Sequence, residues 1–265
     1  MKKEKLKRWR NYGVLVLTLA LAMAASFKYI SSYSTVSSNV NGKELPICSV
    51  ETKEKKVSLT FDVSWGDKDI DRILDILENE GIRATFFMTG TWVEKYPEAV
   101  RRMKEAGHDL ANGSESHRSM VEMGEEEQKV EVMRVHERVM EMTGVEMKLF
   151  RLPYDNYDDP TIRNVSSCGY FPIQWSVNSL DWKDYGADHI VDTVLNNRNM
   201  KNGAIILLHN ETKYTADALY SIIKGIREKG YQMVPVSELI YEKDYHMDVT
   251  GRQMKDRAVL RQILQ

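Results

Sequence analysis

The sequence predicts an α/β protein built on a parallel sheet, and three observations carry that prediction. Short runs rich in β-branched and aromatic residues alternate with amphipathic stretches from residue 57 to residue 240. About seven strand–helix units fit in this length, close to the number in a barrel of parallel strands. Hydrophobic residues make up 42% of the 265 positions, charged residues 29%, and there are six prolines, so the chain can bury a large core.

The predicted elements follow in order. The run 57–61 is the first strand; apolar residues then recur at helical spacing from Ile70 to Leu77, and Gly81 ends that helix. The later predicted strands are 83–88, 148–151, 170–177, 204–208 and 231–236. The later predicted helices are 97–106, 130–142, 187–199 and 215–229. In such an arrangement the active residues are expected at the carboxyl ends of the strands.

The amino terminus predicts a membrane-directed segment. Lysines and arginines dominate the first ten residues, and an apolar run follows at 12–27. This run is shorter than the roughly 20 residues that span a bilayer, but the long side chain of Lys28 can reach the membrane surface and so extend the span. The small residues at 22–24 (Ala-Met-Ala) also suit cleavage by a signal peptidase. Residues 1–30 are therefore expected to be a cytoplasmic basic tail followed by either a membrane anchor or a cleaved signal peptide. Because positive flanks stay inside, the rest of the chain is expected outside the cytoplasm, held at the cell membrane or secreted.

Three further segments are expected after the membrane segment. Residues 31–56 are rich in Ser, Asn, Thr and Lys without a sustained apolar period, which predicts a linker. Residues 57–242 form the domain. The tail 243–265 mixes charge with scattered apolar positions, which allows a short terminal helix without a chemical role.

Composition excludes some classes of function. The formal net charge is −2, so no overall basic field gathers nucleic acid, and no nucleic-acid partner is expected. Cys48 and Cys168 are too few for a disulfide scaffold or a cysteine-based zinc module. The oligomeric state is left open.

Uncommon polar residues follow several of the predicted strands. Asp62 ends the first strand, Arg151 ends the strand 148–151, and His209 follows Leu208. The segments 112–117 and 181–182 also follow strands. Each residue alone has an ordinary structural explanation, such as a helix cap or a surface ion pair. Five segments that converge on one rim of a sheet instead predict a catalytic or binding site.

These segments carry motifs that resemble, in their order along the chain, those of the polysaccharide deacetylase family, which shares the chitooligosaccharide-deacetylase (NodB-type) homology domain. The motifs are Thr60-Phe61-Asp62, Asn112 through Ser116-His117, Arg151-Leu152-Pro153-Tyr154, Ser179-Leu180-Asp181-Trp182 and Gly203 through His209. The resemblance covers residues 57–240 and implies a distorted (β/α)7 barrel. Ser64-Trp65-Gly66 and Lys213-Tyr214-Thr215 look most like the membrane-tethered, sporulation-type branch that acts on peptidoglycan.

The resemblance implies an extracytoplasmic hydrolase that removes N-acetyl groups from an N-acetylglucosamine-containing cell-wall glycan. Members of the family use a water bound to a divalent metal, such as zinc, as the nucleophile, because the metal polarises the amide carbonyl and activates the water. By position, Asp62 is the general base, Arg151 orients it, and His209 protonates the departing amine. Asp181 holds the imidazolium of His209.

The same resemblance implies which residues contact the substrate. They are Tyr154, Pro153, Trp182 and Leu207, of which Trp182 and Leu207 wall the acetyl pocket.

The sequence departs from the family pattern at the metal. Val63 stands where the family has a second Asp, and Gly113 replaces the first of two histidines, so only His117 remains of three metal ligands. Glu115 is the best substitute, because alternate residues of an extended segment share a face; Ser114 and Asp67 are weaker substitutes. Asn178 also replaces an acid in the fourth motif, and a neutral amide would influence the acid–base behaviour of His209 less than a carboxylate.

Two main hypotheses follow from these departures. The chain is a hydrolase with a replaced or weakly held metal, or it binds cell-wall glycan without cleaving it. Bound zinc and activity on an N-acetylated glycan separate the two. A third and weaker hypothesis is a structural envelope protein held by its membrane segment.

Overall fold

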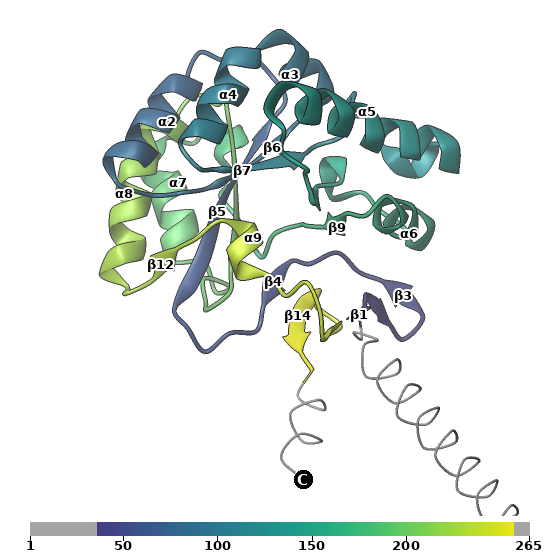
Figure 1. Cartoon of the computed structure of the whole chain (residues 1–265). Coiled ribbons are helices and arrows are strands. Elements are labelled where there is room, and N and C mark those ends of the chain that lie inside the picture. The colour runs from purple at the N-terminus through teal and green to yellow at the C-terminus, as the bar shows by residue number, and fades with distance from the viewer. Residues whose placement is uncertain (1–35, 257–265) are drawn as a thin grey trace, which may run out of the picture. The chain divides into compact units, whose positions relative to one another are not determined.

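A parallel sheet is the centre of the computed structural model, which describes residues 36–256 (Figure 1). Seven strands form one hydrogen-bonded path, and an eighth, β12, pairs with the start of β5. In spatial order they are β10 (Val177–Asn178), β11 (Ile205–His209), β5 (Lys56–Val63), β6 (Thr85–Met88), β7 (Asp109–Asn112), β8 (Leu149–Phe150) and β9 (Phe171–Pro172), with β12 (Gln232–Met233) beside β5. The α/β prediction is confirmed. Because β10 and β9 are the two ends of the path, the sheet is an open half-barrel.

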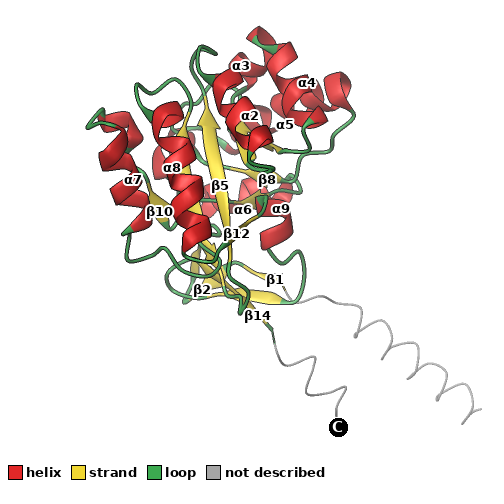
Figure 2. Ribbon diagram, turned by 90° about the vertical axis from the view of Figure 1, so that its left-hand side faces the viewer, coloured by secondary structure: helices red, strands yellow, loops and turns green. Residues whose placement is uncertain are grey.

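Helices follow most of the strands (Figure 2). Those on the outer side of the sheet are α2 (Ile70–Asn79), α3 (Gly90–Lys95), α4 (Pro97–Glu105), α5 (Glu125–Thr143), α6 (Asp159–Ser167), α7 (Ala187–Leu195) and α8 (Thr215–Glu228). The short helix α9 (Val236–Leu239) packs against the inner face instead, through Val236 and Leu239. Three short 3-10 turns join them: η1 (Met120–Glu122), η2 (Pro153–Asp155) and η3 (Asp181–Lys183). Apolar residues of the strands and of the outer helices form the larger core.

The strand β5 shows how the alternation of side chains prepares the site. Leu59, Phe61 and Val63 are completely buried in the core beneath the helices. Thr60 points to the other face, where its hydroxyl donates to the carbonyl of Ile206 at 2.7 Å. Since successive side chains of a strand point to opposite faces, Asp62 emerges on the inner face and Val63 on the outer one.

The stretch expected to be a linker contributes to the fold instead. Ile47 and Val50 are buried, in a second apolar cluster with Phe87 and Ile205 from the inner face of the sheet. The backbone N–H of Val50 donates to the carbonyl of Gly203 at 2.9 Å. The inner face of an open sheet carries apolar side chains that need a cover, and residues 47–50 supply part of it.

Short strands flank the sheet at both ends of the described range. On the amino-terminal side they are β1 (Val36–Ser37), β2 (Asn39–Val40), β3 (Lys43–Glu44) and β4 (Ser49–Val50). In the tail, β13 (Tyr245–Met247) and β14 (Arg252–Lys255) form an antiparallel pair, and β14 also pairs with β4. Residues 243–256 are therefore not helical, and the buried side chains of Tyr245 and Met247 complete the inner cluster. The apolar positions that allow a short terminal helix fall in 257–265, outside the described range.

The predicted strand 170–177 is two strands. Its halves, β9 and β10, lie at opposite edges of the sheet, and residues 173–176 cross the opening between them. The sequence pattern did not reveal this break: Gln174 and Ser176, the polar residues of the run, lie in the crossing segment and not in a strand.

The predicted membrane segment 1–30 lies outside the described residues. Between residues 36 and 256, no helix combines the length and the apolar character needed to cross a bilayer.

Candidate functional site

The structure brings the predicted catalytic residues together at the carboxyl ends of the central strands. Asp62 and His209 are register partners on the neighbouring strands β5 and β11. Arg151 follows β8, and Asp181 begins the turn η3 after β10. Residues far apart in the sequence thus share one rim, as expected of parallel strands.

Asp62 is held by an arginine from across the half-barrel. The Nη1 of Arg151 donates to Oδ1 of Asp62 at 2.7 Å, and its Nη2 donates to the carbonyl of Gln174 at 3.3 Å. The guanidinium lies 4.0 Å from the ring centre of Phe87, and Arg151 is only 2% exposed. Since the arginine is packed and bonded on several sides, it fixes the direction in which the second oxygen of Asp62 points.

His209 and Asp181 form the second charged pair. The Nδ1 of His209 lies 2.7 Å from Oδ1 of Asp181, whose Oδ2 accepts from the His209 backbone N–H at 2.8 Å and from the Thr215 hydroxyl at 2.6 Å. Burial by itself would lower the pKa of His209, but the hydrogen bond and charge of Asp181 raise it overall. Burial would likewise raise the pKa of Asp181, yet the bonds from His209 and Thr215 keep it below the usual value. The imidazole is thereby favoured in its protonated form.

A cavity of about 510 Å³ that opens to solvent is lined by one member of each pair, Asp62 and His209. Its lining residues are Asp62, Ser64, Trp65, His117, Tyr154, Asp155, Trp175, Asn178, Trp182, Leu207 and His209. This volume is in the range of small-molecule pockets in proteins.

Three of the four predicted substrate contacts line this cavity. Tyr154 and Trp182 are 67% and 56% exposed, and Leu207 is buried at its base. Pro153 is not among the lining residues, because it is buried and starts the turn η2, and its contact with substrate stays a prediction. Its rigid ring fixes the turn that presents Tyr154.

The residues present do not fit a zinc site. Catalytic zinc normally takes three protein ligands. His117 lines the cavity, but Val63 is buried in the outer core and Gly113 has no side chain. Over residues 36–256, no group of three or more His, Cys, Asp or Glu side chains is placed to hold a metal ion.

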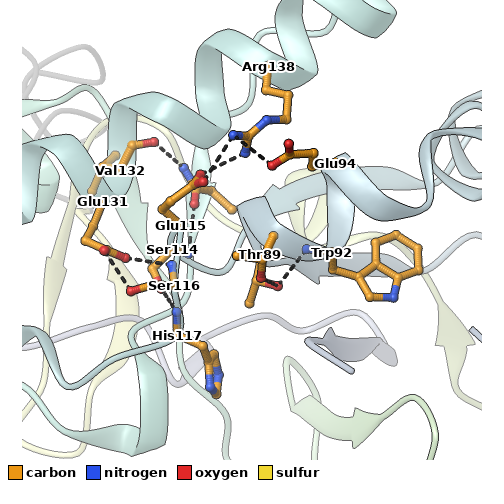
Figure 3. A network of polar contacts seen from close by, with 12 residues as sticks. Thr89, Trp92, Glu94, Ser114, Glu115, Ser116, His117, Glu131, Val132 and Arg138 are labelled. Atoms are coloured by element: carbon orange, nitrogen blue, oxygen red, sulfur yellow. Dashed lines mark hydrogen bonds and ion pairs between the residues drawn. The ribbon is translucent and has the colours of Figure 1, made fainter. Parts of the chain in front are cut away.

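Glu115 cannot replace the missing ligands, and that expectation is wrong. Its carboxylate forms two hydrogen bonds with Arg138, at 2.8 and 3.1 Å, and Figure 3 shows it pointing away from the imidazole of His117. The hydroxyl of Ser114 accepts from the backbone N–H of His117, and Asp67 is exposed and does not line the cavity. The segment 113–117 is therefore a folded loop, in which alternation of faces does not apply.

Sequence reasoning missed several lining residues. Trp65 belongs to the motif Ser64-Trp65-Gly66, which was used only to assign the chain to the sporulation-type branch of the family. Trp175 lay inside a predicted strand. A tryptophan directly after a strand end was the available signal for Trp65. Asn178 does line the cavity, but its Oδ1 accepts from the backbone N–H of Leu180 at 2.9 Å, so it shapes a turn.

Comparison with known proteins identifies the same family as the motifs. The polysaccharide deacetylase family model matches residues 49–173. A peptidoglycan-N-acetylglucosamine deacetylase of Bacillus cereus is 30% identical over 188 residues, covering 69% of this chain and 68% of the relative. The peptidoglycan-N-acetylmuramic acid deacetylase PdaA of Bacillus subtilis is 29% identical over 204 residues, covering 74% and 75%.

Among solved structures, BA3943 of Bacillus anthracis, described as a CE4 family pseudoenzyme, is 28% identical with a TM-score of 0.70, covering 79% of this chain and 72% of that one. A mutant of BA3943 described as having restored enzymatic activity has the same TM-score at 29% identity, covering 75% and 72%. With five ordered motifs gathered at one rim and relatives over most of its length, the chain belongs to the polysaccharide deacetylase family.

Proposed function

We propose that the chain is a hydrolase that removes N-acetyl groups from an N-acetylglucosamine-containing glycan such as peptidoglycan. The observation that carries this proposal is the pairing of Arg151 with Asp62 and of Asp181 with His209, because Asp62 and His209 lie next to each other on neighbouring strands and line one cavity. Such an arrangement supplies a base and an acid to the same bound group. The relatives named as peptidoglycan deacetylases support the substrate class.

In this reaction a water molecule attacks the acetyl carbonyl carbon. Asp62 takes a proton from the water, and Arg151 keeps its carboxylate oriented. The carbon–nitrogen bond then breaks, and protonated His209 gives its proton to the nitrogen, while Asp181 stabilises the imidazolium. The products are acetate and a free amine on the sugar. Trp182 and Leu207 form the walls against which the acetyl methyl group packs.

The missing metal ligands limit this activity. Deacetylases of this family are generally metal-dependent, whereas this chain does not assemble a zinc site from its described residues. Water activation then rests on Asp62 alone, so we expect slow turnover.

The replaced ligands also favour a second candidate function, which is binding of cell-wall glycan without cleavage. Val63 and Gly113 remove two ligands while the cavity and its aromatic lining remain. The structural neighbour described as a pseudoenzyme supports this candidate.

Release of acetate from N-acetylglucosamine oligomers and from purified peptidoglycan tests both functions. For a hydrolase, Asp62→Asn and His209→Ala each reduce the rate by about a hundredfold or more, since general acid–base catalysis contributes that much. Tyr220→Ala, an exposed change on α8 away from the cavity, is the matched control. Wild-type protein that binds the oligomers and releases no acetate above background is a glycan-binding protein.

The cellular setting belongs to the same proposal. The basic amino terminus and the apolar run 12–27 support an extracytoplasmic domain, tethered to the cell membrane or secreted after cleavage. The sporulation-type branch and the distorted (β/α)7 barrel preceded by a membrane segment stay predictions from the sequence motifs.

A further inference from the structure

The one histidine left from the family's metal site is packed between two aromatic side chains. The ring centre of His117 lies 4.8 Å from that of Tyr154 and 6.2 Å from that of Trp65, both in edge-on geometry. All three line the cavity, and Trp65 and Tyr154 are 56% and 67% exposed. We call Trp65, His117 and Tyr154 the aromatic wall.

The backbone under two members of the wall is strained and held. His117 and Tyr154 have φ angles of 55° and 61°, in the left-handed region that side chains other than glycine rarely adopt. The backbone N–H of His117 donates to the hydroxyl of Ser114 at 3.0 Å, which holds the loop. Strain of this kind persists where the surrounding structure imposes it and is concentrated at functional sites.

The loop that carries Trp65 is also fixed from below. The fully buried Asn210 donates through Nδ2 to the carbonyls of Trp65, at 3.2 Å, and of Gly66, at 2.7 Å. The indole N–H of Trp92 donates to the same Gly66 carbonyl at 2.8 Å. A large exposed ring on a rigid base loses little freedom on binding, so its burial by a ligand yields more affinity.

We infer that the aromatic wall binds the face of a neutral pyranose ring, in the sugar next to the one whose acetyl group enters the cavity. His117 then acts as the aromatic filler of the wall, in place of a metal ligand. A pyranose ring presents a face of C–H groups, which packs against aromatic rings. Of the described residues that line the cavity, two are the carboxylates Asp62 and Asp155 and none is Lys or Arg, so a neutral sugar fits better than an acidic one. This inference rests on the proposed function, whether or not the glycan is cleaved.

Calorimetric titration with the N-acetylglucosamine tetramer, in buffer with a chelator, tests the wall. Trp65→Ala is expected to weaken binding by about three- to tenfold, the size of one aromatic contact. Tyr220→Ala removes an equally exposed aromatic ring on α8 and is expected to leave affinity unchanged. Because the Trp65 side chain is largely exposed, its removal leaves the core intact, and a thermal melt verifies folding.

Two substitutions of His117 distinguish its role as an aromatic filler of the wall from a role as a metal ligand. His117→Phe keeps a flat ring and cannot bind metal, so its affinity is expected within about twofold of the wild type, while His117→Ala loses about as much as Trp65→Ala. Replacing the chelator by zinc is expected to leave wild-type affinity unchanged. Equal weakening by His117→Phe and His117→Ala in folded proteins, or tighter binding with zinc, would overturn the filler role.

The outcomes separate this inference from the proposed function. If the wild type neither binds the tetramer nor releases acetate, the proposed function fails. If the wild type binds and Trp65→Ala binds equally well, only the aromatic wall is wrong. If His117→Phe does not fold, the Trp65→Ala and zinc titrations still decide the case.

Discussion

Asp62 and Asp181 are both carboxylates at strand ends, and their partners give them different chemistry. Asp62 faces the cavity with one oxygen on Arg151. Asp181 is completely buried and has its oxygens on His209 and Thr215, so no water or substrate reaches it. At the scale of single residues, hydrogen bonding and burial therefore separate a carboxylate that faces the cavity from one whose oxygens are both used to hold its neighbours.

Asp181→Asn tests this positioning role through pH. The raised pKa of folded His209 means that the pair stabilises the protein below the ordinary value of 6.5, and that this contribution is lost as pH rises through the folded pKa. Without the carboxylate, the effect of burial dominates and the pKa of His209 falls. The part of the pH–rate profile in which activity declines as His209 loses its proton then moves to lower pH. An NMR titration of the imidazole measures the shift. An unchanged His209 titration in the folded variant would contradict the role given to Asp181.

Val63 and Gly113 stand where the family resemblance implies metal ligands, and the structure shows what a ligand at each position would require. Val63 is completely buried in the outer core. Gly113 does not have a positive φ, but a Cβ there would meet backbone atoms of Phe87 and Met88 at 3.2 Å. A carboxylate at position 63 is therefore costly unless the end of β5 turns it toward the cavity, and a histidine at position 113 needs a small shift of β6.

The double variant Val63→Asp with Gly113→His is expected to be less stable than the wild type without metal, by about 3 kcal/mol. Zinc is expected to restore the melting temperature, because two ligands join His117, and to raise acetate release. His209→Ala in this background should abolish the gain in acetate release. A melting temperature that does not respond to zinc would mean that the new carboxylate remains in the core.

At the scale of elements, the residues that lead into β11 make close backbone contacts with β4. Gly203 has a φ of 80°, and a Cβ at this residue would lie 1.8 Å from the carbonyl oxygen of Val50. The two residues also share a hydrogen bond of 2.9 Å. Only glycine permits this approach, which brings the segment 47–50 over the inner cluster.

Gly203→Ala tests the importance of this contact, with Gly169→Ala as the matched control. Gly169 also has a positive φ, 86°, but a Cβ there has open space. The control is expected to lower the free energy of unfolding by about 1 kcal/mol from backbone strain alone. Gly203→Ala adds a clash with backbone and is expected to cost about 2–4 kcal/mol more. Equal melting temperatures for the two variants would show that β4 is loosely attached.

At the scale of the whole molecule, the proposed function requires the domain to lie on the side of the membrane where its substrate is. A domain that acts on cell-wall glycan must lie outside the cytoplasm, and the basic residues before the apolar run 12–27 favour that orientation. Cys48 and Cys168 are both free thiols, so the described fold does not depend on a disulfide between them.

A reporter fused after Gln265 tests the orientation. A reporter that works only outside the cytoplasm is expected to be active, because positively charged flanks remain inside. The matched fusion to a reporter that works only in the cytoplasm is expected to be silent. Activity of the second fusion alone would reverse the predicted orientation.

The sequence by itself determined the class of fold and which charged residues meet at one rim of the sheet. Alternating strand and helix patterns predict a parallel sheet, and Asp62, Arg151 and His209 follow strands, so one rim had to collect them. The sequence also shows that Val63 and Gly113 cannot bind zinc, because neither residue has a donor atom in its side chain, wherever it points.

Only the tertiary structure decided where the remaining side chains point. Glu115 turns to Arg138 in a loop with positive φ angles at its neighbours, and Trp65 turns to His117 in a loop held by hydrogen bonds from the distant Asn210. Val50 covers the inner face because a glycine some 150 residues later lets two backbones meet. Local patterns record the period of a strand or helix, but the direction of a loop and the pairing of distant segments depend on contacts that exist only in the folded chain.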